Sequence, residues 1–120
     1  MNQMKGPIDA FLGHLQDERR LSPHTVAGYR RDLSKLKVFV ASLNGNDLLH
    51  LKPVEARLFP AQLPRRGLTG RSIQRALSAA RSLYRYLMRE KLVRSNPFDG
   101  IRAPRGERKL PETLSADQSA

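Results

Sequence analysis

The chain has 120 residues and a formal net charge of +11 at neutral pH, a size that suits one small domain with tails. Because it contains no cysteine, disulfides, thiolate metal sites and cysteine nucleophiles are excluded, and a reducing compartment is favoured. The N-terminus lacks the apolar centre of a signal peptide, and no apolar run approaches the roughly 20 residues of a membrane span. We therefore expect a soluble, cytosolic protein.

The positive charge is concentrated in the second half of the chain. Residues 65–109 hold 13 basic side chains, eleven of them arginine, against three acidic ones, whereas residues 1–64 carry a net charge of +3. Guanidinium groups match phosphate oxygens and stay charged, so this distribution favours a nucleic-acid partner. An anionic membrane, an acidic protein or a merely solvated surface are the alternatives.

Two helices are predicted in the first 43 residues. The first spans about residues 7–20, with an apolar stripe at three- and four-residue spacing formed by Ile8, Phe11, Leu12 and Leu15. The second begins with Ser22 as N-cap and Pro23 at its first position. Its apolar seam consists of Val26, Tyr29, Leu33, Leu36, Val40 and Leu43. The opposite side carries His24, Arg31, Ser34 and Lys35, with Arg30 and Lys37 on the flank, and residues 44–47 form a turn.

Residues 48–64 are harder to interpret. Val54, Leu58 and Phe59 favour a short third helix after Pro53, yet Pro60 opposes an uninterrupted one. Residues 65–70 form an exposed connection to the next helix.

A strong fourth helix is predicted from about Thr69 to Lys91. Its buried face consists of Ile73, Ala76, Leu77, Ala80, Leu83, Tyr84 and Leu87. About a third of its circumference forms what we call the polar arc: Arg71, Gln74, Arg75, Ser78, Arg81, Ser82, Arg85 and Arg89. Such an arc can meet both phosphates and base edges in a major groove wide enough for a helix.

After Ser95 the helical pattern stops. Proline or glycine recurs every few residues, so residues 96–111 are predicted to be an extended basic linker, with Val93, Phe98 and Ile101 pinning its start to the bundle. Ser115 resembles the cap of a further helix. The pattern predicts a small all-α bundle with no repeat and no strand, divided into a domain of residues 1–94 and a linker of residues 95–120.

The sequence shows no catalytic constellation. His14, His24 and His50 are isolated from one another, and there is no carboxylate cluster, metal-ligand spacing or glycine-rich phosphate loop, so we expect no metal and no cofactor. Tyr29 and Tyr84 are predicted to be core residues. Tyr86 lies off the apolar stripe and could stack on a base or touch a phosphate. The predicted DNA contacts are His24, Thr25, Arg30, Arg31, Lys35, Arg71, Ser72, Gln74, Arg75, Ser78, Arg81 and Arg85.

Three motifs give the sequence a family resemblance. They read S-P-H-T-x-x-x-Y-x-x-D-L from Ser22, S-x-x-R-x-L-S-A-x-R-x-L-Y-x-Y-L from Ser72, and N-P-x-x-G-I-x-x-P from Asn96. Together they resemble the N-terminal core-binding domain of tyrosine recombinases (the phage integrase family), and most closely its XerC-type branch, over about residues 8–115.

The resemblance implies a four-helix SAM-like bundle that forms half of a C-shaped DNA clamp, its second and fourth helices facing the major groove. It also implies that residues 96–111 lead to a catalytic domain that supplies the arginines, lysine, histidines and nucleophilic tyrosine. No catalytic residue is therefore assigned here. The implied partners are recombination-site DNA, a XerD-like recombinase in a four-protomer synapse and a DNA translocase.

Two other functional classes stay open. One is a standalone, non-catalytic DNA-binding regulator or the related domain of a phage-type integrase. The other is a protein-interaction bundle whose charge serves solubility or an acidic partner.

Overall fold

The computed structural model describes residues 6–43 and 47–102. Every regular element in these ranges is helical: α1 (Pro7–Asp17), α2 (Pro23–Ala41), the 3-10 turn η2 (Leu48–His50), α3 (Pro53–Ala56), α4 (Leu58–Gln62), the 3-10 turn η3 (Leu63–Arg66) and α5 (Gly70–Arg89). The predicted all-α fold is thus confirmed. No helix in this part of the chain is both long and apolar enough to cross a membrane.

The two long helices begin at hydroxyl caps. In α2 the Ser22 hydroxyl accepts a hydrogen bond from the Thr25 N–H at 3.1 Å, as the sequence predicts. In α5 the Thr69 hydroxyl accepts one from the Ser72 N–H at 3.2 Å. These bonds satisfy amides of the first turn, which have no partner within the helix.

Both α1 and α5 end before their predicted last residues. Arg20 has a φ of 54° and Lys91 a φ of 63°, which lie in the left-handed region. A right-handed helix cannot include such a residue, so α1 and α5 end before Arg20 and Lys91, with Asp17 and Arg89 as their last residues.

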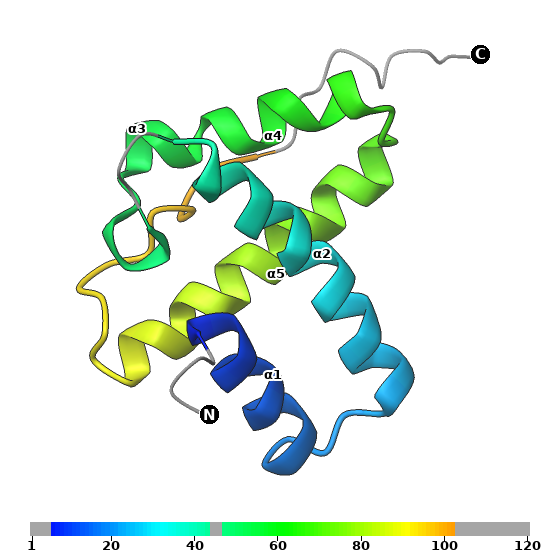
Figure 1. Cartoon of the computed structure of the whole chain (residues 1–120), viewed down its shortest axis with the longest axis vertical. Coiled ribbons are helices and arrows are strands. Elements are labelled where there is room, and N and C mark those ends of the chain that lie inside the picture. Colours follow the sequence, from blue (N-terminus) through cyan, green and yellow to red (C-terminus); the bar gives the residue numbers. More distant parts are fainter. Residues whose placement is uncertain (1–5, 44–46, 103–120) are drawn as a thin grey trace.

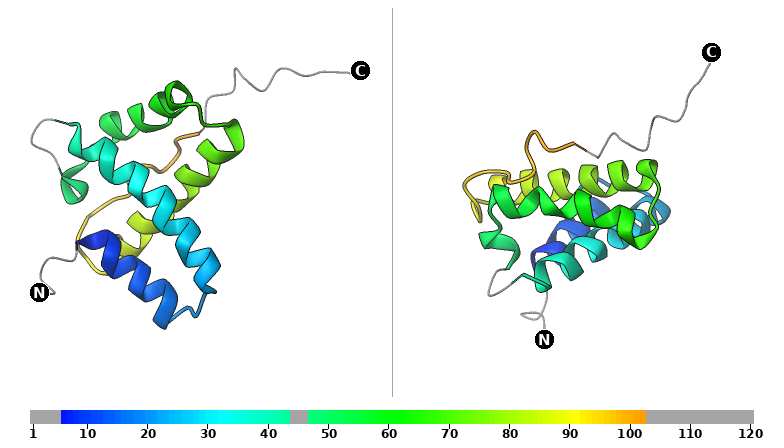
Figure 2. Two further views of the ribbon diagram at one scale, coloured as in Figure 1. Left: turned by 45° about the vertical axis from the view of Figure 1, so that its right-hand side comes forward. Right: turned by 90° about the horizontal axis from the view of Figure 1, so that it is seen from above.

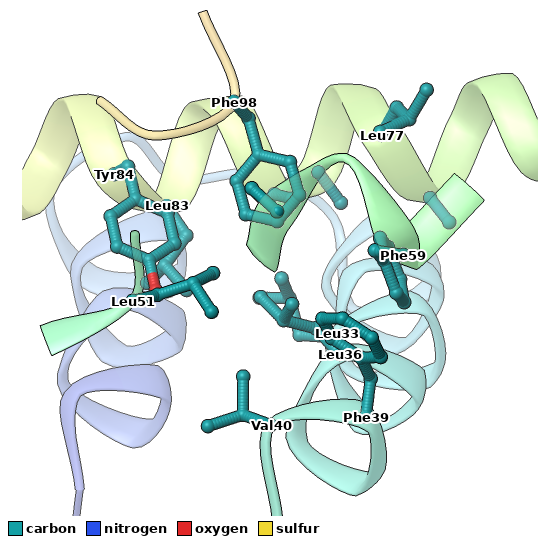
Figure 3. Close-up of a cluster of buried hydrophobic side chains, with 14 of the residues drawn as sticks. Leu33, Leu36, Phe39, Val40, Leu51, Phe59, Leu77, Leu83, Tyr84 and Phe98 are labelled. Atoms are coloured by element: carbon teal, nitrogen blue, oxygen red, sulfur yellow. The ribbon is translucent and has the colours of Figure 1, made fainter. Parts of the chain in front are cut away.

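The core lies between α5 and the pair formed by α1 and α2. The two longest helices, α2 and α5, cross at the centre of the molecule, and α1 packs beside both (Figures 1 and 2). Figure 3 shows α5 running across α1 and α2, with aliphatic and aromatic side chains filling the space between them. All the predicted apolar residues of α5 are buried. In α2 the buried set also contains Phe39, which the spacing did not identify.

The region between α2 and α5 folds as a series of single turns. A short helix starts at Pro53, as the sequence favours, but Val54 and Leu58, two of the apolar residues that suggested it, are 59% and 50% exposed. Ala56, Phe59 and Leu63 are buried in their place. Because each element is so short, Pro53, Pro60 and Pro64 all fall in a first turn, where a missing N–H breaks no helical hydrogen bond.

Residues 96–101 form a strap that packs on the helices, contrary to the prediction of an unpacked linker there. Phe98 is completely buried, with its ring centroid 5.9 Å from that of Phe59 and 5.6 Å from that of Tyr84. Figure 3 shows it pointing from the strap into the core. The expectation that Phe98 and Ile101 pin this segment is confirmed, and the core extends past residue 94. The predicted linker from residue 103 onward, residues 44–46 of the predicted turn and the predicted start of a helix at Ser115 lie outside the described residues.

Candidate nucleic-acid interface

The middle of the polar arc of α5 faces solvent. The exposed arc residues are Arg71, Gln74, Arg75, Ser78, Arg85 and Arg89. Ser72, at the start of the helix, is half-buried and its amide is used by the Thr69 cap. The exposed residues combine guanidinium, amide and hydroxyl groups, which suit phosphates and base edges alike.

A groove of about 330 Å³ separates the first half of α2 from α5. It is lined by His24, Thr25, Gly28, Tyr29, Arg31, Asp32, Arg75, Ser78 and Ala79. We call it the α2–α5 groove. Five of the predicted contacts, three from α2 and two from α5, thus line a single depression: His24, Thr25, Arg31, Arg75 and Ser78.

Arg30 does not belong to this groove. It lines a separate hollow beside α1, together with Ile8 and Asp9. Successive residues of an α-helix are rotated by about 100°, so Arg30 and Arg31 point to different flanks of α2. The helical spacing placed Arg31 opposite the apolar seam and Arg30 on the flank, and in the structure the two residues line separate hollows.

Asp32 lies at one wall of the α2–α5 groove and bonds to two cations. Its Oδ1 accepts a hydrogen bond from Lys35 Nζ at 3.1 Å, and its Oδ2 accepts one from Arg75 Nε at 3.2 Å. The Asp32 side chain is 4% exposed, whereas those of Lys35 and Arg75 are 25% and 51% exposed. This network joins α2 to α5 and leaves the guanidinium of Arg75 partly open to solvent.

Arg81 is held on the other edge of the arc by the strap. Its Nε donates to the Phe98 carbonyl at 3.4 Å, and its Nη2 donates to the Ile101 carbonyl. In return the Asn96 side-chain amide donates to the Arg81 carbonyl at 3.2 Å and accepts the Phe98 N–H at 3.0 Å. We call this set of bonds the Arg81 clasp. The predicted DNA contact at Arg81 is therefore engaged within the molecule.

The tyrosines of α5 also have internal partners. Tyr84, confirmed as a core residue, donates its hydroxyl to the Leu48 carbonyl at 2.6 Å, and burial raises the pKa of its phenol. Tyr86 is half-buried, with its ring centroid 5.5 Å from that of Phe11 and 5.0 Å from that of His14. Desolvation likewise raises the pKa of Tyr86. The packing of Tyr86 against α1 does not favour the idea that it stacks on a base.

Two of the histidines pair with acidic side chains three or four residues away. His14 pairs with Glu18 at 3.3 Å, and His50 with Asp47 at 2.8 Å. The hydrogen bond from His50 lowers the pKa of Asp47. Among the described residues there is no group of three or more potential metal ligands.

Sequence reasoning missed the functions of two residues. Asp32 was seen only as a letter of a motif, although it falls three residues after Tyr29 and four before Leu36, which places it on the buried side of α2. Asn96 was interpreted only as the start of a linker and the first residue of a motif. No sequence pattern pointed to its bonds with Arg81, because the two residues lie on different segments.

Comparisons with known proteins agree on one family. Residues 8–91 match the phage integrase N-terminal SAM-like domain. The chain is 45% identical over 116 residues to the tyrosine recombinase XerC of Pseudomonas aeruginosa (strain LESB58). The corresponding proteins of Pseudomonas syringae pv. tomato and Alcanivorax borkumensis are 43% identical over 122 residues and 46% identical over 112 residues.

These relatives are much longer than the present chain. The alignments cover 97%, 98% and 92% of this chain but 38%, 39% and 35% of the three relatives. The chain therefore spans less than two fifths of their length. No solved structure matches it.

Proposed function

The chain belongs to the phage integrase N-terminal SAM-like domain family, and from this premise we propose that it binds double-stranded DNA as the N-terminal clamp half of a XerC-like site-specific tyrosine recombinase. Its role in the whole protein is to hold recombination-site DNA in register during strand exchange, which resolves chromosome dimers before segregation at cell division. Strand cleavage belongs to the part of the relatives that this chain does not cover. This chain alone binds DNA without cutting it.

The observation that carries this proposal is the meeting of two basic helices at one groove. Residues predicted to contact DNA come from α2 and α5 and line the same depression. The exposed centre of the arc, with Arg71 and Arg85, continues this surface along α5. A surface of this kind suits the polyanionic backbone of a duplex.

The proposed contact surface differs from the sequence-based set in one residue. It retains His24, Thr25, Arg30, Arg31, Lys35, Arg71, Ser72, Gln74, Arg75, Ser78 and Arg85. It omits Arg81, because the guanidinium of Arg81 bonds to the strap. Arg30 contacts DNA only from the α1 side of α2, outside the groove.

The partners follow from the same family. In the intact protein we propose a four-protomer synapse with a XerD-like recombinase, activated by a DNA translocase. The location is then the cytoplasm, in association with the nucleoid.

A charge-reversal experiment tests the DNA-binding surface. Arg71→Glu combined with Arg85→Glu changes two exposed arginines that make no side-chain hydrogen bond to another described residue. Fluorescence anisotropy with a 30-base-pair duplex should show an affinity loss on the order of 100-fold at moderate salt. The slope of log K against log salt should decrease by about 0.9 for each phosphate that the variant no longer neutralises.

The matched control applies the same charge change elsewhere. Arg19→Glu with Arg94→Glu alters two exposed arginines outside the polar arc and the α2–α5 groove. This variant should lose less than about fivefold in affinity, because neither arginine belongs to the proposed contact surface. Equal losses in the two double variants contradict the proposed surface.

The two rival functions make different predictions. A protein-interaction bundle binds duplex DNA weakly, without the steep salt dependence of phosphate contacts. A standalone regulator binds DNA as tightly, but its gene does not continue in frame into the family's Arg, His-x-x-Arg and Tyr signature. Footprinting on candidate recombination sites, in parallel with scrambled duplex, measures the sequence specificity that the proposal requires.

A further inference from the structure

Among the residues whose side chains the structure describes, Asp32 is the one charged residue that is buried. A carboxylate that leaves water without a partner is strongly destabilising, so its two cationic partners are held close. Each of its oxygens bonds to one of them, Lys35 on its own helix and Arg75 on α5. Asp32 therefore fixes groups that belong to two different helices.

Arg75 is held in a way that leaves its outer nitrogens available. The bond to Asp32 uses Nε, and the side chain is still 51% exposed. Its Nη atoms make no hydrogen bond with another described residue. A guanidinium is planar and rigid, so fixing Nε from one side also fixes the direction of the two Nη groups.

Two Nη groups fixed in this way suit a pair of adjacent hydrogen-bond acceptors. Two parallel N–H groups bind bidentately to phosphate oxygens, or to the N7 and O6 atoms of guanine in the major groove. Arg71 and Arg85, in contrast, pair with no carboxylate of the described residues, and binding must first restrict their side chains at an entropic cost.

We propose that Asp32 is a positioning residue for DNA recognition. Its carboxylate binds Nε of Arg75, so that the Nη groups meet a bidentate DNA acceptor in a pre-formed orientation. This inference rests on the proposed function and adds a role for an acidic residue that never touches DNA. The acceptor is a phosphate or a guanine edge, each of which offers two adjacent hydrogen-bond acceptors to the guanidinium group.

For Asp32→Asn, the proposal and simple electrostatics predict opposite changes in DNA affinity. Asp32→Asn removes one negative charge beside a DNA-binding groove, and long-range attraction alone then predicts tighter binding to a polyanion. Loss of positioning predicts weaker binding, although the net positive charge has increased.

The test uses the complete 120-residue chain and a 30-base-pair duplex that the wild-type chain enriches from a randomised pool. We expect Asp32→Asn and Arg75→Gln each to weaken binding about tenfold. The double variant should be no more than about twofold weaker than Arg75→Gln alone, because Asp32 acts through Arg75. Asp17→Asn, which makes the same charge change at an exposed site outside the groove, should bind as tightly as wild type or slightly tighter.

The outcomes separate the two proposals. A wild-type chain that binds no duplex overturns the proposed function together with the positioning role. A wild-type chain that binds well, with Asp32→Asn binding equally or more tightly, overturns the positioning role alone. In the enriched duplex, 7-deazaguanine or a methylphosphonate should remove the part of the affinity that depends on Arg75. Insensitivity to both modifications at every position also overturns the proposal.

A measurement on the wild-type chain covers the case in which Asp32→Asn does not fold. NMR relaxation of the arginine Nε–H groups should show an Arg75 order parameter near that of rigid backbone, about 0.85, and values below about 0.6 for Arg71 and Arg85. An Arg75 as mobile as the other two contradicts the inference.

Discussion

Arg75 and Arg81 lie on the same helix and in the same polar arc, yet they perform different tasks. Arg75 bonds to Asp32 in the α2–α5 groove and remains half exposed. Arg81 bonds to two carbonyls of the strap and is half-buried. Six residues apart, they are separated by about 120° around the helix axis, so they face opposite neighbours of α5.

This difference shows how an amphipathic helix uses its charged face. The centre of the arc, with Arg71 and Arg85, points to solvent, while its two edges meet α2 on one side and the strap on the other. Charged side chains at the edges thus bind groups within the protein, whereas Arg71 and Arg85 at the centre make no hydrogen bond to another described residue. The comparison predicts that variants at the strap affect folding and that variants in the groove affect DNA binding.

The largest effect should follow from removing the aromatic anchor of the strap. Phe98 is completely buried, so Phe98→Ala should lower the free energy of unfolding by about 3–5 kcal/mol, measured by urea denaturation. Leu92→Ala is the control at a nearby exposed position, 50% exposed, and should change stability by less than about 1 kcal/mol. A loss below about 1 kcal/mol for Phe98→Ala contradicts the description of the strap as part of the core.

Arg81→Ala should distinguish the strap edge of the arc from its exposed centre. Two strap carbonyls lose their donor, which should lower the free energy of unfolding by about 1–3 kcal/mol. Duplex affinity, measured well below the melting temperature, should change less than about threefold. Arg85→Ala should give the opposite pattern, with stability almost unchanged and affinity reduced. If Arg81→Ala weakens DNA binding more than Arg85→Ala, the clasp does not exclude Arg81 from the interface.

Tyr84 joins α5 to η2, because its hydroxyl donates a hydrogen bond to the Leu48 carbonyl. Tyr84→Phe should therefore lower the free energy of unfolding by about 1 kcal/mol. The pKa of Tyr84 is raised above its ordinary value of 10.0, so below that value both folded and unfolded chains keep the phenol proton. Above pH 10.0 the Tyr84 phenol loses its proton in the unfolded chain before it does so in the folded chain, so the free energy of unfolding falls as pH rises. Tyr84→Phe should reduce this alkaline loss in denaturation curves between pH 9 and about 11; an unchanged pH dependence contradicts the hydrogen-bonded, buried phenol.

The smallest effect is expected outside both regions, at the exposed pair of Asp47 and His50. The hydrogen bond from His50 lowers the pKa of Asp47, so the pair contributes stability above the ordinary carboxyl pKa of 3.8 and loses it as pH falls below that value. Asp47→Asn should change the free energy of unfolding at pH 7 by less than about 0.5 kcal/mol, because the pair is solvent-screened. Duplex affinity should not decrease. A larger change in stability indicates that η2 depends on this pair more than its exposure implies.

The sequence determined the helices whose signals are local. Hydroxyl caps at Ser22 and Thr69 define where α2 and α5 begin, and three- and four-residue spacing identifies the buried face of α5, because both signals act within a few residues. Composition and motifs also identified a basic helical domain and its family. The series of single turns from Pro53 to Arg66 was not predictable, because only burial against the core shows that Phe59 and Leu63 turn inward while Val54 and Leu58 do not.

The tertiary structure alone decided which charged residues serve the fold. The Asp32–Arg75 pair joins residues 43 positions apart, and the three clasp bonds that involve Arg81 itself join residues 15 to 20 positions apart. Helical periodicity assigned both arginines to one polar face, since it records only the angle around a single axis. The partner of each arginine depends on which segment packs against that edge of α5, and this arrangement exists only once the helices and the strap have come together.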